Sequence, residues 1–441
     1  MQPPTPPGTL DGPAVGPPTT SRPAPARDRP LPRERLLDRH RSAVLAVGSA
    51  YLAVVTVIPV LTTPYRSDDA INRTVHERFT ASGLSYVEFV AQWIGPWVTR
   101  EGRFFPGSAA WTLAVFTTFT TREQYKAFLA ALVLTMVVLT VTLVTTLTRA
   151  ALAPVVVVAL TSTLTLRSWF DGLDTFSGVL PLTVCLTLGS GLLLLAGRGL
   201  PSAVAASLLY GYALVTYEVA ILLAPTLCVV VWCVRRRWTR MLPLVVPTAV
   251  VCVVVLALRS RATGSDGDAY RINLEPWRVL VTYTKQAAAA LPLSEQWFPG
   301  GAGLDVAPAL VGLTTVLVGV PAAVVLVTLG RAPVHVTRSR LALAAFVGAS
   351  CWLLPPLLVA VSLGWQNQLP PGHGYVSLVW GYVGVAVLVA TAWTALARST
   401  QRDASPLRRA ALHLASGAIA VTAALTVAQS VTVAVALAAT G

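Results

Sequence analysis

Long apolar runs separated by short polar connectors recur along most of the chain. Most runs have the length of about 17 to 25 residues that an α-helix needs to cross the hydrocarbon core of a bilayer. The pattern predicts an all-α, polytopic integral membrane protein with about eleven transmembrane helices, because the alternating segments of a transmembrane β-barrel do not occur. We predict the spans at residues 42–61, 125–148, 151–167, 178–197, 201–217, 219–234, 241–258, 307–329, 341–363, 376–397 and 409–438.

Two parts of this pattern allow more than one interpretation. Residues 201–234 form one apolar stretch broken only by Glu218. We divide it into two short spans, because a single span would place the basic segment 235–240 outside. Residues 104–121 are apolar enough to cross. We interpret them as a helix partly embedded in the outer face, since a crossing would invert every later loop.

Basic and acidic residues divide between the two sides of this map. The formal net charge is +14, although only 12% of the residues are charged. The predicted inner segments hold 20 basic and 5 acidic residues, and the rest of the chain holds 13 basic and 14 acidic ones. Cytoplasmic loops carry such an excess of Arg and Lys. We therefore expect a cytoplasmic N-terminus, an extracytoplasmic C-terminus and no nucleic-acid partner.

The chain divides into two regions of different composition. Residues 1–41 are rich in Pro and Arg, and such a segment is expected to be a disordered cytoplasmic tail because it cannot bury enough apolar surface. Residues 42–441 form the transmembrane domain, with long outer loops at about 62–124 and 259–306. All five cysteines lie in apolar runs, so neither a disulfide nor a zinc site is expected.

The first outer loop carries the most distinctive polar residues. It opens with the adjacent carboxylates Asp68 and Asp69 in "PYRSDDAINR". Ser85, followed three residues later by Glu88, predicts a capping box at the start of an aromatic-rich helix in the headgroup region. Arg103 follows this helix. The loop therefore combines carboxylates and a cation at the membrane surface.

The other outer segments add further candidates for substrate binding. A helix is predicted from Pro276 to about residue 291, and Arg278 and Lys285 share one of its faces because they are seven residues apart. The remaining candidates in shorter outer connectors and at a span end are Asp171, Asp174, Glu218 and His373.

These features resemble the GT-C glycosyltransferases, which are polytopic enzymes that use polyprenyl-phosphate sugars. "DDAINR" (68–73) followed by a surface helix and "GRFF" (102–105) is similar to the bacterial O-antigen glucosyltransferase-like branch, as is "TYEVAILLAP" (216–225). The resemblance covers about residues 42–234. It implies an inverting transferase in a bacterial plasma membrane, surrounded by membrane lipids, that acts on a glycan or lipid acceptor. The family's last outer loop often supplies an Arg, whereas this chain offers only His373 there.

The chemistry of sugar transfer is compatible with these residues. An acceptor hydroxyl must lose its proton, so Asp68 or Asp69 is a candidate general base, and the sequence does not decide between them. The phosphate leaving group needs cations, for which Arg103, Arg278 and Lys285 are candidates. No cofactor is certain, but the carboxylate that is not the base could hold a divalent cation.

Each candidate also has a purely structural interpretation. The acidic pair could cap a loop, and Arg103 could pair with Glu101 or Glu123. Arg278 and Lys285 could extend to the interface, and Asp171 and Asp174 could serve turns. Trp93 and Trp97 are expected as membrane anchors rather than sugar-stacking surfaces. The alternative function is therefore non-enzymatic: a lipid or glycan flippase, or a scaffold in envelope assembly.

Overall fold

The computed structural model describes residues 32–168, 171–261, 271–297, 306–375, 377–403 and 405–440. The chain divides into two units, residues 1–42 and 43–441, and everything below concerns the second unit except where the helix α1 crosses the boundary. Residues 1–31 of the predicted disordered tail lie outside the described residues. Residues 32–41, which were also predicted as tail, instead belong to the helix α1, which begins at Pro32. Every regular element in the described ranges is helical, apart from one isolated bridge between Ile272 and Ser362.

Nine helical segments of the described chain are long and apolar enough to cross a membrane, which is the architecture of a multi-pass membrane protein. Four contain the single helices α1 (Pro32–Thr62), α6 (Arg122–Thr148), α8 (Val179–Ala196) and α9 (Gly199–Thr216). The other five contain α11 (Leu242–Arg259), α14 (Pro308–Thr314) with η4 (Thr315–Gly319) and α15 (Val320–Gly330), α16 (Arg338–Leu353) with α17 (Pro355–Ala360), α19 (Leu378–Arg402) and α20 (Pro406–Thr440).

Two of the eleven predicted spans are shorter than expected. Helix α10 (Ala220–Arg235) has 16 residues, and α7 (Ala153–Thr161) has nine. The division of 201–234 is confirmed, since α9 ends at Thr216 before α10 begins. The run 151–167 looked like a complete span because every residue before Arg167 is apolar or small. Helix α7 is buried among α6, α15, α19 and α20.

The non-helical chain after α7 is stabilised by side chains of α20. Ser430 Oγ accepts a hydrogen bond of 3.0 Å from the Leu166 backbone N–H, and Thr426 Oγ1 donates one of 3.0 Å to the Ser162 carbonyl. Irregular backbone is tolerated at membrane depth where protein surrounds it and satisfies its polar groups. Apolar run length alone could not reveal this break.

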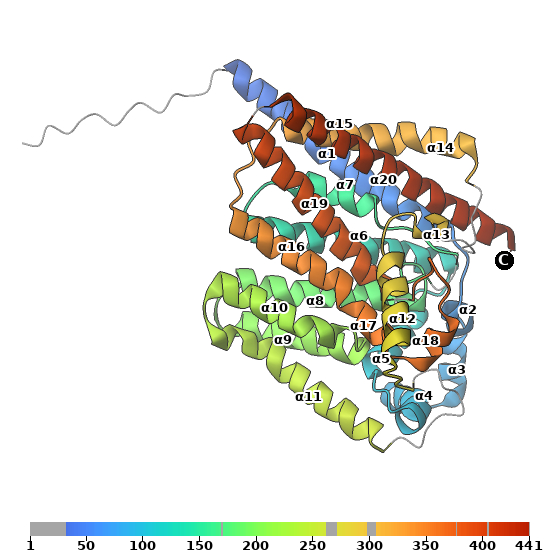
Figure 1. The fold of residues 1–441 in the computed structure, drawn as a ribbon. Coiled ribbons are helices and arrows are strands. Elements are labelled where there is room, and N and C mark those ends of the chain that lie inside the picture. Colours follow the sequence, from blue (N-terminus) through green and yellow to red (C-terminus); the bar gives the residue numbers. More distant parts are fainter. Residues whose placement is uncertain are drawn as a thin grey trace, which may run out of the picture. The chain divides into compact units, whose positions relative to one another are not determined.

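Short helices gather at one end of the long helices (Figure 1). They are α2 (Asp68–Asn72), α3 (Val75–Ser82), α4 (Tyr86–Glu101), α5 (Pro106–Thr118), α12 (Pro276–Ala289), α13 (Ser294–Trp297) and α18 (Leu363–Gln368). Helix α5, in the ambiguous 104–121 segment, has 13 residues. At a rise of about 1.5 Å per residue such a helix is too short to cross a bilayer core of about 30 Å.

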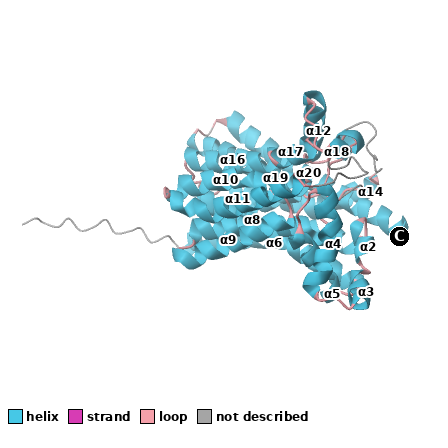
Figure 2. Cartoon of the chain, turned by 90° about the horizontal axis from the view of Figure 1, so that it is seen from below, coloured by secondary structure: helices cyan, strands magenta, loops and turns pink. Residues whose placement is uncertain are grey.

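The opposite end of this unit carries the basic connectors. The links from α8 to α9, from α10 to α11, from α15 to α16 and from α19 to α20 all lie there (Figure 1). Figure 2 shows the same division from below, with α12 and α18 at the end away from the α8–α9 link. The two ends therefore differ in both structure and charge.

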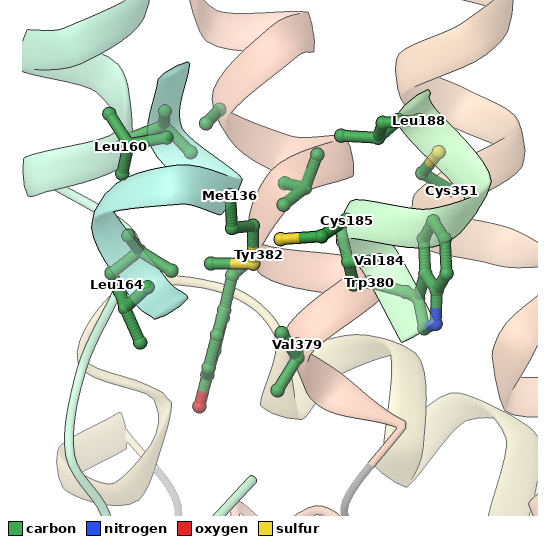
Figure 3. Close-up of a cluster of buried hydrophobic side chains, with 14 of the residues drawn as sticks. Met136, Leu160, Leu164, Val184, Cys185, Leu188, Cys351, Val379, Trp380 and Tyr382 are labelled. Carbon is green, nitrogen blue, oxygen red and sulfur yellow. The ribbon is translucent and has the colours of Figure 1, made fainter. Parts of the chain in front are cut away.

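Apolar side chains fill the space between the long helices. Figure 3 shows part of this core, where Met136, Leu160 and Cys185 pack near Trp380 and Tyr382. All five cysteines, each in a described segment, are free thiols, as expected. The Tyr382 hydroxyl points out of the cluster toward the end that holds the short helices.

Candidate functional site

The two adjacent carboxylates at the start of α2 have different surroundings. Asp69 is fully buried, whereas Asp68 is exposed and lines a cavity of about 270 Å³. Ser67, directly before them, has a positive φ of 49°. A non-glycine residue in this region costs energy and persists only where the surroundings impose it. The two adjacent carboxylates at the start of α2 thus face different surroundings: Asp68 faces the cavity and Asp69 faces the core.

Asp69 is held by hydrogen bonds from two other segments. It accepts from the Tyr125 hydroxyl and, at 2.7 Å, from the Ser177 backbone N–H. Ser177 and its neighbour Phe176 both have positive φ, 55° and 56°. Burial raises the pKa of the Asp69 carboxyl to about 7, although both hydrogen bonds favour its charged form. These contacts make Asp69 an anchor of the loop beneath the cavity.

A second buried carboxylate, Asp174, joins the first loop to α6. It forms an ion pair of 3.3 Å with Arg66 and one of 3.8 Å with Lys126, and the side chains of Asp174 and Lys126 are almost completely buried. Asp171 is also buried and accepts hydrogen bonds from the backbone of Arg167 and Leu173. Burial and the nearby Asp174 raise the pKa of Asp171 to about 7. Both acids are buried, and neither lines the cavity.

The cavity wall is largely aromatic. Besides Asp68, the lining includes one guanidinium group, from Arg103. The aromatic residues that line it are Trp93, Trp97, Phe105, Phe176, Tyr217 and Tyr375. Trp93 and Trp97, expected as membrane anchors, are half-buried and face this space. The predicted capping box at Ser85 is confirmed and fixes the start of the helix that carries both tryptophans.

Arg103 pairs with a residue far away in the sequence. Its Nη2 lies 3.2 Å from Glu218 Oε2, and its guanidinium lies 5.0 Å from the Phe105 ring centre. The pairing with Glu101 or Glu123 that we considered is therefore wrong. Gly102 ends α4 with φ 62°, and a Cβ there would lie 2.7 Å from the Cα of Arg259. This close approach turns Arg103 away from its own helix and toward the α9–α10 break.

A second, smaller cavity adjoins the first. Its volume is about 60 Å³, and it shares Arg103, Tyr217 and Tyr375 with the larger one. Glu218 and Arg259 complete its charged lining. Arg259 ends α11, and its Nε is buried without a hydrogen-bond partner in the described ranges. Arg259 was not predicted as a site residue from the sequence, although its position at the start of the second long outer loop could have indicated it.

Arg278 and Lys285 lie on one face of α12, as predicted, but line neither cavity. Arg278 forms an exposed ion pair of 2.8 Å with Glu275 and donates to Asn367 Oδ1 at 3.3 Å. Lys285 Nζ donates to the Leu369 carbonyl at 3.0 Å. Both residues therefore contact α18 and the chain that follows it.

His373 belongs to a buried polar cluster behind the cavities. Its Nδ1 lies 3.5 Å from Glu295 Oε1, and burial lowers the pKa of the imidazole. Arg167 is buried beside them, donating to the Tyr382 hydroxyl at 2.6 Å and to the Gly372 carbonyl at 2.8 Å. The cluster ties the 369–375 loop to α13 and α19. Sequence reasoning did not identify Arg167, since nothing nearby in the sequence indicates these partners.

The described part of the chain offers few ligands for a divalent cation. No group of three His, Cys, Asp or Glu side chains converges there. Asp68 is the carboxylate that faces the larger cavity, and Glu218, in the smaller one, already pairs with Arg103.

The raised pKa of Asp69 predicts a pH dependence of stability. The folded protein keeps this proton up to about pH 7, whereas an unfolded aspartate loses it near its ordinary pKa of 3.8. The protonated Asp69 side chain therefore makes its full contribution to the free energy of unfolding below about pH 4. This contribution is lost as the pH rises from about 4 to 7.

Between about pH 4 and 7, the free energy of unfolding of Asp69→Asn should fall less than that of the parent. The difference should be on the order of a few kcal/mol. Asp403→Asn, at an exposed position, is the control. Thermal unfolding in detergent across the pH range measures the difference, and equal slopes for the parent and Asp69→Asn would contradict it.

No protein-family model matches this chain, and a search of curated proteins finds no significant match.

Proposed function

We propose that the protein is a GT-C-like membrane glycosyltransferase that moves a sugar from a polyprenyl-phosphate donor to a glycan or lipid acceptor. One observation carries the proposal: a carboxylate, Asp68, and a guanidinium, Arg103, line the same aromatic-walled cavity at one end of the long apolar helices. A general base and a cation for a leaving phosphate are the two groups that such a transfer requires.

Asp68 is the proposed general base. Partial desolvation raises the pKa of its carboxyl, which makes it a stronger base than a fully hydrated aspartate. The acceptor oxygen attacks the anomeric carbon of the donor while its proton passes to Asp68. The bond between that carbon and the phosphate oxygen breaks, and polyprenyl phosphate leaves with the electron pair. Attack opposite the leaving group inverts the anomeric configuration, as in the enzymes that the chain resembles.

The smaller cavity is the proposed site of the donor phosphate. Two guanidinium groups, those of Arg103 and Arg259, line it with one carboxylate, Glu218, so its lining has an excess of positive charge. Apolar side chains also line it: Leu358 and Val359 of α17, Val361 directly after α17, and Ile272 from the chain before α12. A lipid phosphate matches both features, because its anion needs hydrogen-bond donors and its polyprenyl chain needs apolar contacts.

Arg259→Gln should weaken donor binding. Losing a hydrogen bond to a charged group costs about 2 kcal/mol, which corresponds to roughly thirtyfold in affinity. Arg278→Gln is the matched control, because Arg278 is exposed and lines neither cavity. Binding of polyprenyl-phosphate sugars extracted from bacterial membranes, measured by mass spectrometry of lipid retained on the purified protein, tests this. Equal retention by the two variants would move the phosphate site elsewhere.

The proposed orientation has the cavities on the extracytoplasmic face of a bacterial plasma membrane. The basic connectors lie at the end away from the cavities, and an excess of Arg is typical of the cytoplasmic side. The C-terminus is then extracytoplasmic, and membrane lipids surround the long helices.

Reporter fusions test this orientation. Fusions at Arg237 and Gln401 should report the cytoplasm, because Arg237 lies in the basic α10–α11 connector and Gln401 lies in the last turn of α19, next to the basic α19–α20 connector. A fusion at Gly83, between α3 and α4, should report the exterior. An exterior signal at Arg237 together with a cytoplasmic one at Gly83 would invert the proposed orientation.

A further inference from the structure

The end of the protein away from the candidate site carries a concentration of basic side chains. One hollow of about 410 Å³ there is lined by Arg398, Gln401 and Arg402 of α19 and by His335 in the α15–α16 connector. Arg398 also lies near two like charges, those of Arg402 and Arg338. The hollow therefore combines several positive groups around an open space.

A second hollow adjoins the first through Gln401. Its volume is about 280 Å³, and Arg331, Arg409 and His413 line it. Leu326, Val327 and Leu412, from α15 and α20, form its apolar side. Guanidinium groups thus lie next to an apolar helix surface in this hollow. A lipid needs both, because its phosphate binds cations and its acyl chain packs against apolar side chains.

This positive charge has almost no acidic compensation. Asp403 is the only acidic residue in the sequence after residue 305, and it forms an exposed ion pair of 3.2 Å with Arg408. No carboxylate lines either hollow among the described residues. Arg235, in the last turn of α10, differs, since it donates to the carbonyls of Leu194 and Gly197 at 3.4 and 3.2 Å. The bias of basic residues toward one side of the membrane does not by itself explain why these arginines surround hollows.

We propose that the two hollows together bind the headgroup of an anionic phospholipid, with one phosphate in each. Two arginines line each hollow, the two share Gln401, and the apolar surface of α15 and α20 accepts the acyl chains. Basic pockets between transmembrane helices bind anionic headgroups by these forces. A phospholipid with two phosphate diesters satisfies both hollows, and a lipid with one diester satisfies only one. This site is independent of the proposed catalytic function.

Lipid titration of the full-length protein, followed by native mass spectrometry, tests the proposal. Cardiolipin should bind more tightly than phosphatidylglycerol, and phosphatidylcholine should not compete with it. The variant Arg398→Gln/Arg402→Gln should lose roughly thirtyfold in affinity for cardiolipin, because each arginine near an anionic surface contributes about fivefold. Arg236→Gln/Arg237→Gln removes the same charge from the α10–α11 connector and should bind as the parent does.

Two further arms distinguish the outcomes. Arg398→Lys/Arg402→Lys should restore most of the affinity, and thermal unfolding should show that all variants remain folded. Inorganic phosphate should not displace the lipid at millimolar concentration. Equal losses for the two Gln pairs, or displacement by inorganic phosphate, would overturn the proposal, because binding would then reflect general charge or a free anion rather than a lipid site.

Discussion

Asp68→Asn should lower the rate of sugar transfer at least about a hundredfold, because positioned acid–base groups contribute roughly 10²–10⁴-fold in rate. Asparagine keeps the shape of the side chain but cannot take the acceptor proton. Asp68 faces the larger cavity and forms no part of the buried network beneath it, so the variant should fold, insert and bind donor normally. Initial rates of transfer from a polyprenyl-phosphate sugar in nanodiscs, measured beside donor binding, give the comparison.

Asp69→Asn is the matched control for this prediction, because the neighbouring carboxylate does not face the cavity. The asparagine oxygen can still accept the hydrogen bond of the Ser177 backbone N–H. We expect a smaller loss of transfer and a larger effect on the stability of the loop. The reverse order, with a severe loss at Asp69 and none at Asp68, would mean that the base acts from inside the network.

Asp174→Ala should strongly destabilise the protein. It leaves the buried Lys126 ammonium without its ion-pair partner and removes the 3.3 Å contact with Arg66. Breaking a buried pair by removing one partner costs about 3 to 5 kcal/mol, since the other charge stays buried. The midpoint of thermal or denaturant unfolding in detergent should fall accordingly.

Two variants separate this mechanism from general damage to the protein. Lys126→Met in the Asp174→Ala background removes the unpaired charge and should recover part of the loss. Asp403→Asn breaks an exposed ion pair, with side chains 46% and 59% exposed, and should cost less than about 1 kcal/mol. Equal destabilisation by Asp174→Ala and Asp403→Asn would show that the buried network contributes little.

Local signals in the sequence predicted much of the helical architecture. The capping box at Ser85 and the helix that begins at Pro276 both form, because each depends on residues within one helical turn. The division of 201–234 near Glu218 was also correct, although it was based on keeping the basic segment 235–240 on the inner side rather than on a local pattern. Span 151–167 was not predicted correctly, since its short helix is stabilised by neighbours that are distant in the sequence.

The candidate site depended more on tertiary contacts. The sequence identified Asp68 and Arg103 but could not show that they line one cavity. Glu218, the partner of Arg103, is 115 residues away, and no local pattern encodes that pairing. Arg259 reaches the smaller cavity because Gly102 allows a close approach of two backbones. Such contacts depend on how helices pack, which hydrophobic periodicity does not specify.

In the proposed reaction the protein consumes a polyprenyl-phosphate sugar, and Asp68 takes the proton of the acceptor. The most direct measurement follows the lipid fraction of nanodiscs that contain the parent or Asp68→Asn, supplied with sugar-bearing polyprenyl phosphates and acceptor glycans extracted from bacterial membranes. Mass spectrometry should show the parent converting donor to free polyprenyl phosphate over time, with the sugar appearing on an acceptor, while Asp68→Asn binds donor and leaves it intact. An intact donor with the parent, or the same conversion rate with Asp68→Asn, would contradict the account; movement of the intact donor across the bilayer would favour a flippase instead.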